Sequence, residues 1–177
     1  MHTANHAAPT GPTGSILEGS NAAPRLEEVE RAIAKRSFCT LATVSPAGRP
    51  HAAGVVYAAV DGRLWLSTDR GSRKARNIAA NQRVHVNIPV RRAPVGPPSS
   101  IHFEATAELF ERHDPLVRRL AEAGRLRVIT AHGELDRADG CFVRITPADV
   151  LHTYGLGLPL RTLIRDPLHA AGRVVRR

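Results

Sequence analysis

The feature that most constrains the fold of this sequence is the dipeptide Asp61-Gly62, which stands between two strand-like runs. Asp-Gly adopts the left-handed backbone of a tight two-residue turn and so joins neighbouring antiparallel strands. The flanking runs, about 50–60 and 63–68, are rich in Val, Ala and Leu, with one Tyr and one Trp. These residue types suit a half-buried sheet. We therefore predict an antiparallel hairpin over residues 50–68.

Other short apolar runs with Gly or Pro between them predict further strands, at 37–44, 83–90, 101–109 and 141–145, the last with a possible extension to 154. Helical spacing and capping residues predict helices only at 26–36, at 72–80 and from about 114. Many short strands with few helices are typical of a small antiparallel barrel. We expect a mainly β protein with helices (α+β), folded as one domain.

The two ends of the chain differ from its middle. Residues 1–24 are rich in Ala, Gly, Pro and Thr without periodicity, so we expect a flexible leader before a domain at 25–155. Residues 156–177 form a basic tail without a clear period, which we expect to pack on the barrel or on a partner subunit. No apolar run reaches membrane-spanning length, and the start lacks a signal-peptide pattern. We expect a cytoplasmic protein without a membrane partner.

Positive charge is concentrated in one part of the sequence. The formal net charge is +9, and residues 63–92 hold eight basic residues against the single acid Asp69. Lysine occurs only at Lys35 and Lys74, so the basic residues are almost all arginine, whose guanidinium suits phosphate and carboxylate groups. This local excess predicts an anion-binding region.

The segment 66–78 carries the strongest functional signal. A predicted strand ends in Ser67 and Thr68, Ser72 is placed to cap a helix, and Arg73 and Lys74 occupy the first turn of that helix. Cations at a helix N-terminus cost roughly 0.3–1 kcal/mol each, whereas a bound phosphate there is favoured. We interpret the segment as a phosphate site. The alternative is a solvated basic helix in which Ser72 is only a cap.

Several runs resemble the pyridoxamine 5′-phosphate oxidase-like superfamily: Gly48-Arg-Pro-His, Leu64-Trp-Leu-Ser-Thr68, Gly71-Ser-Arg-Lys-Ala-Arg-Asn-Ile and Asn81-Gln-Arg-Val-His-Val86. The resemblance covers about residues 26–150. It implies an FMN-binding split β-barrel, a group that includes enzymes using the deazaflavin F420. It further implies that Thr68, Ser72, Arg73 and Lys74, with Ser67 beside them, hold the cofactor phosphate. Residues Val55, Val56 and Tyr57 would flank the isoalloxazine ring.

The sequence also departs from the namesake enzymes of this superfamily. The namesake enzymes have two basic residues on the second strand, and this sequence has Ala53 and Ala58 at those positions. The C-terminal Arg-x-His motif is also missing. We therefore expect no oxidation of pyridoxamine phosphate. F420 carries a polyglutamate tail that additional arginines would bind, so F420 is the favoured cofactor and FMN the alternative. Candidates for the tail are Arg70, Arg76, Arg91 and Arg92, or the basic tail of a partner.

The expected activity is hydride transfer between the reduced cofactor and a small hydrophobic or conjugated substrate, with no catalytic residue assigned. Non-catalytic binding of FMN, F420 or haem is an alternative. A basic barrel that binds nucleic acid is another class of protein, but aromatics of only 4% argue against it, and we expect no nucleic-acid partner. The superfamily pairs its barrels, and the tail is apolar in part, so we expect a homodimer.

Cysteine and histidine give no signal for a metal site. Cys39 and Cys141 both lie in apolar stretches, which is typical of buried thiols in a reducing compartment. The nine histidines include three on predicted strands, His51, His85 and His102, but none has the spacing of a metal-ligand motif. No metal site is predicted.

Overall fold

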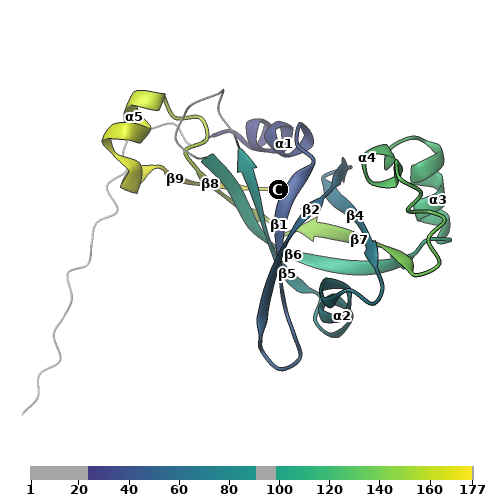
Figure 1. Ribbon diagram of the computed structural model, residues 1–177. Coiled ribbons are helices and arrows are strands. Elements are labelled where there is room, and N and C mark those ends of the chain that lie inside the picture. Colours follow the sequence, from purple (N-terminus) through teal and green to yellow (C-terminus); the bar gives the residue numbers. More distant parts are fainter. Residues whose placement is uncertain (1–23, 91–98, 177) are drawn as a thin grey trace, which may run out of the picture.

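Nine strands form one curled antiparallel sheet in the computed structural model, which describes residues 24–90 and 99–176 (Figure 1). The strands are β1 (Phe38–Val44), β2 (Pro50–Val56), β3 (Ala58–Val60), β4 (Arg63–Asp69), β5 (Arg83–Val90), β6 (Ser99–Glu111), β7 (Gly140–Pro147), β8 (Val150–Tyr154) and β9 (Ala171–Val175). The prediction of a mainly β, antiparallel fold of the split-barrel type is confirmed.

Helices lie at the ends and edges of this sheet. They are α1 (Leu26–Ala34), α2 (Arg73–Ala80), α3 (Pro115–Glu122), α4 (Arg127–Thr130), α5 (Leu160–Arg165) and the 3-10 turn η1 (Pro167–His169). Figure 1 shows α2 beside the β1–β2 hairpin, α3 and α4 beyond β4 and β7, and α5 next to β8 and β9. Among the described residues, no helix has both the length and the apolar character needed to cross a membrane.

The strand order is β2-β1-β5-β6-β7-β4-β3; β8 also pairs with β6, and β9 pairs with β8. The long strand β6 connects the two halves of the sheet. Its first part pairs with β5 and β8, and its second part pairs with β7, in registers such as Phe103 opposite Val86 and Leu109 opposite Val143. The curled sheet therefore closes around one main core.

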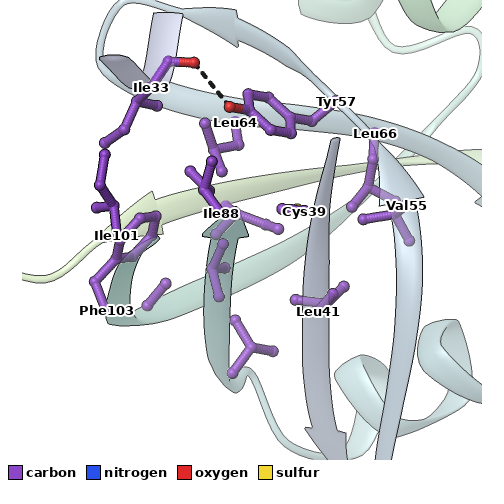
Figure 2. Packing of buried hydrophobic residues seen from close by; sticks show 14 of the residues in the cluster. Ile33, Cys39, Leu41, Val55, Tyr57, Leu64, Leu66, Ile88, Ile101 and Phe103 are labelled. Atoms are coloured by element: carbon purple, nitrogen blue, oxygen red, sulfur yellow. Dashed lines mark hydrogen bonds between the residues drawn. The ribbon is translucent and has the colours of Figure 1, made fainter. Parts of the chain in front are cut away.

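That main core is apolar and buried. Leu41, Leu66, Ile88, Ile101 and Phe103 are each 0% exposed within it, and Figure 2 shows their side chains converging from several strands. A second cluster, which includes Trp65 and Phe142, lies between the sheet and the α3–α4 region. Alternate residues of β4 serve the two clusters, because successive side chains of a strand point to opposite faces.

The Asp61-Gly62 hairpin is confirmed. Asp61 has φ of 50° and Gly62 φ of 70°, as the tight turn between β3 and β4 requires. The expected strand over 50–60 is interrupted at Tyr57, however. Residues before Tyr57 pair with β1, and residues after it pair with β4. The chain therefore changes partner strand at this point, which no local sequence pattern encodes.

The C-terminal segment, in which no regular period was found, forms α5, η1 and β9. Strand β9 pairs with β8, and the Arg176 N–H then donates to Asp149 O over 2.7 Å. Gly172 is required by this packing: a Cβ added there would lie 2.6 Å from Thr153 Oγ1. Ile164 and Leu168, at 66% and 88% exposed, leave an apolar face beside the sheet.

Candidate functional site

The turn between β4 and α2 is fixed by two hydroxyls. Thr68 Oγ1 and Ser72 Oγ lie 3.1 Å apart in a hydrogen bond. Ser72 Oγ also accepts from the Ala75 N–H over 3.2 Å, and so Ser72 is the N-cap of α2, as predicted. The two hydroxyls and the first turn of the helix are thus brought together in space.

The cations on the first turn of α2 have little local compensation. Arg73 is exposed and Lys74 is half-buried, and neither forms an ion pair with another described residue. The first turn of α2 contains no acid. Arg76 differs, because its Nη1 donates to Gly71 O over 2.6 Å and closes the turn. Positive charge at this helix start therefore faces solvent and is available to an anion.

Arg73 and Arg76 line a hollow of about 540 Å³ between α2 and the β1–β2 turn. The opposite wall carries Arg49 and His51, which follow that turn. Asn77 closes the floor: it is 3% exposed, and its Nδ2 donates to Thr43 Oγ1 over 2.9 Å. No carboxylate is among the described residues of its lining. The hollow, which we call the basic hollow, suits an anionic group.

Lys74 lies on a different side of α2 from Arg73. Its charge and that of Arg70 act on the buried thiol of Cys141, on the neighbouring strand β7, where they partly oppose the raising of the Cys141 pKa by burial. The carboxylates of Asp69 and Glu111 act there in the opposite sense. The predicted phosphate ligands therefore do not all face one point, since Arg73 lines the basic hollow and Lys74 lies toward β7.

Ser67 is also separated from Thr68. Strand alternation places Ser67 on the same face of β4 as Trp65, away from the side chain of Thr68. A smaller hollow of about 240 Å³ at the end of β4 is lined by Ser67, Thr68 and Asp69, with Arg137 opposite. Asp69 and Arg137 form an ion pair of 2.7 Å there. An anion in this smaller hollow would compete with that carboxylate.

The three residues predicted to flank the cofactor ring do not share a face. Val55 is 9% exposed and belongs to the main core. Tyr57 is fully buried, and its hydroxyl donates to Ile33 O over 2.7 Å, as the dashed line in Figure 2 shows. Only Val56, 49% exposed, presents its side chain outward, next to Gly54 and Phe38. Contact of a ring with Val55 or Tyr57 would have to be made through their backbone.

Two residues of the basic hollow were not among the predicted ligands: Arg49 and His51. They lie more than twenty residues before α2, and only the folding of the β1–β2 turn against that helix brings them to Arg73. The sequence signal that could have identified Arg49 is its position as a basic residue directly after a glycine turn. Of the four arginines expected at an anionic tail, Arg76 lines the hollow, Arg70 pairs with Glu111, and Arg91 and Arg92 lie outside the described residues.

Comparison with known proteins agrees with the fold. Residues 26–154 match the family model described as pyridoxamine 5′-phosphate oxidase. A search of curated proteins finds no match.

Solved structures are similar over most of the chain. A haem-binding protein from Mycobacterium smegmatis aligns with TM-score 0.64 and 20% identity over 84% of this chain, which spans only 57% of that protein. The haem storage protein HutZ from Vibrio cholerae aligns with TM-score 0.58 and 24% identity, covering 72% of this chain and 94% of HutZ. An FAD-binding protein from Mesorhizobium loti aligns with TM-score 0.60 and 19% identity, covering 73% and 92%.

Proposed function

This chain belongs to the pyridoxamine 5′-phosphate oxidase family, and on that premise we propose that it is an F420-dependent oxidoreductase, with FMN as the alternative cofactor. The reaction proposed is hydride transfer between the reduced cofactor and a small hydrophobic or conjugated substrate. We do not propose oxidation of pyridoxamine phosphate, because positions 53 and 58, where the namesake enzymes would have basic residues, are alanines.

The observation that carries the proposal is the basic hollow. Arg49, Arg73 and Arg76 surround about 540 Å³ with no carboxylate on the described lining. Arg73 stands in the first turn of α2, whose N-cap is Ser72. This set is what a phosphate monoester or diester needs: positive charge and the N-terminus of a helix.

The arrangement favours F420 over FMN for a chemical reason. FMN presents one phosphate, whereas F420 continues beyond its phosphate into a chain of carboxylates. Three arginines from two separate elements exceed what one phosphate requires, and arginine binds carboxylate in a bidentate manner. Arg49 and Arg76 are proposed for the anionic tail, and Arg73, with the start of α2 at the Ser72 cap, for the phosphate.

The bound cofactor would supply the hydride chemistry, and the residues of this chain would bind and orient it. The outer face of β2 is the proposed ring contact. Ala52 and Gly54 are exposed there beside Val56, so the backbone of an edge strand is accessible to a flat ring. Small side chains at these positions let a planar group approach closely.

We also propose a homodimer. The described apolar face of the tail includes Leu160, Ile164 and Leu168, all exposed in the single chain. A second copy would cover it, in line with the rarity of large exposed apolar patches on monomers. Light scattering at micromolar concentration should give twice 19.1 kDa, and a particle of 19.1 kDa would contradict the proposal.

The test is cofactor titration of two double variants. Arg49→Ala with Arg73→Ala removes two charge-assisted contacts from the basic hollow, which should weaken F420 binding by roughly two to four orders of magnitude. The matched control is Arg118→Ala with Arg119→Ala, which removes two exposed arginines from α3. The control should bind as the wild type does. Equal dissociation constants for all three proteins would show that the start of α2 is an ordinary basic helix end.

A second candidate is a binding protein without turnover, for FMN, F420 or haem. It is favoured by the similarity of the fold to a haem-binding and a haem storage protein. Absorbance of the purified protein separates the candidates, because haem, flavin and deazaflavin have distinct bands. Reduction of a substrate panel by the loaded protein then separates the enzyme from the carrier.

A further inference from the structure

Three histidines form a row across the outer face of the sheet, two strands away from β2, since Ala42 of β1 is directly opposite both Ala52 and His85. They are His85 on β5, His102 on β6 and His152 on β8. His102 is directly opposite His152 in the β6–β8 register, and its ring stacks on that of His152 with centroids 5.2 Å apart and planes at 17°. The ring of His85 lies on the other side, 5.4 Å from that of His102.

Two nitrogens of this row face one another. His102 Nδ1 and His85 Nε2 are 3.3 Å apart and share a hydrogen bond, so one ring donates and the other accepts. Zinc–imidazole bonds are about 2.0–2.1 Å, and two nitrogens at this separation then subtend roughly 105–110° at a shared ion. That angle is tetrahedral. A metal ion could therefore take the place of the shared proton once the two rings turn to point both lone pairs at it.

We propose that His85 Nε2 and His102 Nδ1 bind one divalent first-row transition ion, in the class of Zn²⁺, Ni²⁺ and Cu²⁺. Imidazole is a preferred ligand of these ions, and Cu²⁺ should bind most tightly among them. The stacked ring of His152 is a positioning residue, because it holds the plane of His102. The described residues contain no group of three His, Cys, Asp or Glu arranged around one point, so solvent completes the coordination.

Charged side chains of both signs lie beside the row. Glu104 is directly opposite His85 in the β5–β6 register and lies two residues from His102 along β6. Arg173 is directly opposite His152 in the β8–β9 register. Glu104 favours a cation between His85 and His102, and Arg83, two residues before His85 on β5, opposes it in part.

The site is accessible from solvent. His85 and Glu104 are exposed and line an open hollow of about 660 Å³, which Arg83 also lines. Solvent ligands can therefore reach the ion. An exposed two-histidine site holds its metal in exchange with solution, in contrast to the closed four-ligand sites of structural zinc.

Titration calorimetry of the full chain with Zn²⁺, Ni²⁺ and Cu²⁺ chlorides tests the proposal. We expect one ion per chain, with Cu²⁺ the tightest. His85→Ala and His102→Ala should each weaken binding more than tenfold. His152→Ala should weaken it by less than tenfold, because it removes only the stacking partner. His113→Ala, which removes an exposed histidine outside the row, should bind as the wild type does.

Cobalt gives a second readout that does not depend on stability. Co²⁺ bound through two imidazoles should give visible absorption bands that His85→Gln and His102→Gln abolish, while circular dichroism confirms that both variants are folded. Failure of the wild type to bind any of the four ions would overturn the proposal. Binding that survives in both the His85 and the His102 variants would overturn it equally. Neither result would affect F420 binding at α2.

Discussion

The side-chain hydroxyls of Thr68 and Ser72 share a hydrogen bond, 3.1 Å between their oxygens, that ties the end of β4 to the start of α2. Ser72→Ala removes this bond and the N-cap together, so the free energy of unfolding should fall by about 1 kcal/mol. Thr68→Val keeps the shape and the cap, so its effect should be smaller. Urea denaturation of the two variants checks the order, and a larger loss in Thr68→Val would contradict it.

A substitution of Tyr57 tests whether this residue supports the fold or contacts the cofactor. Its buried hydroxyl donates to Ile33 O and joins α1 to the sheet. Tyr57→Phe leaves that carbonyl without its donor, and stability should fall by about 1–3 kcal/mol. Cofactor affinity should be unchanged, because the side chain lies inside the core. Measured together, a lower midpoint in urea and an unaltered dissociation constant are expected. A large loss of affinity in a folded Tyr57→Phe protein would place the hydroxyl in the site instead.

Arg144 is held by one carboxylate and two aromatic rings. Its Nη2 lies 2.9 Å from both oxygens of Glu108, and its Cζ lies 4.8 Å from the ring centroid of Phe110 and 6.0 Å from that of Trp65. Arg144→Met keeps much of the apolar stem and removes the charge, which should cost about 1–2 kcal/mol. Thermal and urea unfolding measure the loss. Arg118→Met on exposed α3 is the control, and an equal loss in both variants would remove the role assigned to the rings.

The two thiols should be unreactive in the folded protein. Burial raises the pKa of Cys39 to about 12 and raises the pKa of Cys141 as well. Thiol is therefore the dominant form at pH 8, and both sulfurs are shielded. Ellman's reagent should label no thiol in the native protein and two in guanidinium chloride. Rapid labelling of one thiol in native buffer would contradict this prediction.

The same pKa shift fixes a pH dependence of stability. An acid whose pKa is higher in the folded than in the unfolded state keeps its proton longer when folded. For Cys39 the unfolded chain begins to lose its thiol proton near the ordinary pKa of 9.0, whereas the folded protein keeps it up to about 12. The free energy of unfolding therefore falls over this pH range. Burial raises the pKa of Tyr57 in the same sense. The melting temperature should therefore fall as the pH rises above 9, and Cys39→Ala should flatten that fall.

Local sequence patterns were sufficient wherever an element is specified by its own residues. The Asp61-Gly62 turn, the Ser72 cap and the Asp114-Pro115 helix start are each encoded within a few positions, and each is present. The four-residue helix α4 is too short to show a period. Strand β9 was missed because its pairing depends on β8, and the break at Tyr57 because it depends on β1 and β4.

The cations of the candidate site were predictable from the sequence, but their arrangement was not. A basic helix start after a Thr-ended strand predicted an anion site, which stays a prediction, and the structure has these cations at the start of α2. Which of them face one another depends on α2 packing against the β1–β2 turn, so Arg49 and His51 join Arg73 while Lys74 does not. The histidine row is likewise invisible to motif spacing, because its members come from three strands that become neighbours only in the sheet.

Strand β6 has a consequence for how the chain reaches this structure. Strand β6 pairs with β5, β7 and β8. Strand β4 pairs with β7, which follows β4 by some seventy residues in the chain, so this pairing forms only after β7 has been synthesised. Contacts between distant segments form only after long loops have closed, and loop closure costs entropy before the contacts stabilise the fold. Folding is therefore slow compared with a helical bundle, on the order of milliseconds to seconds. A nascent chain that ends before residue 140 exposes the unpaired edges of β4 and of the second half of β6. Such edges bind other strands, so the ribosome-bound intermediate is the species at greatest risk of aggregation.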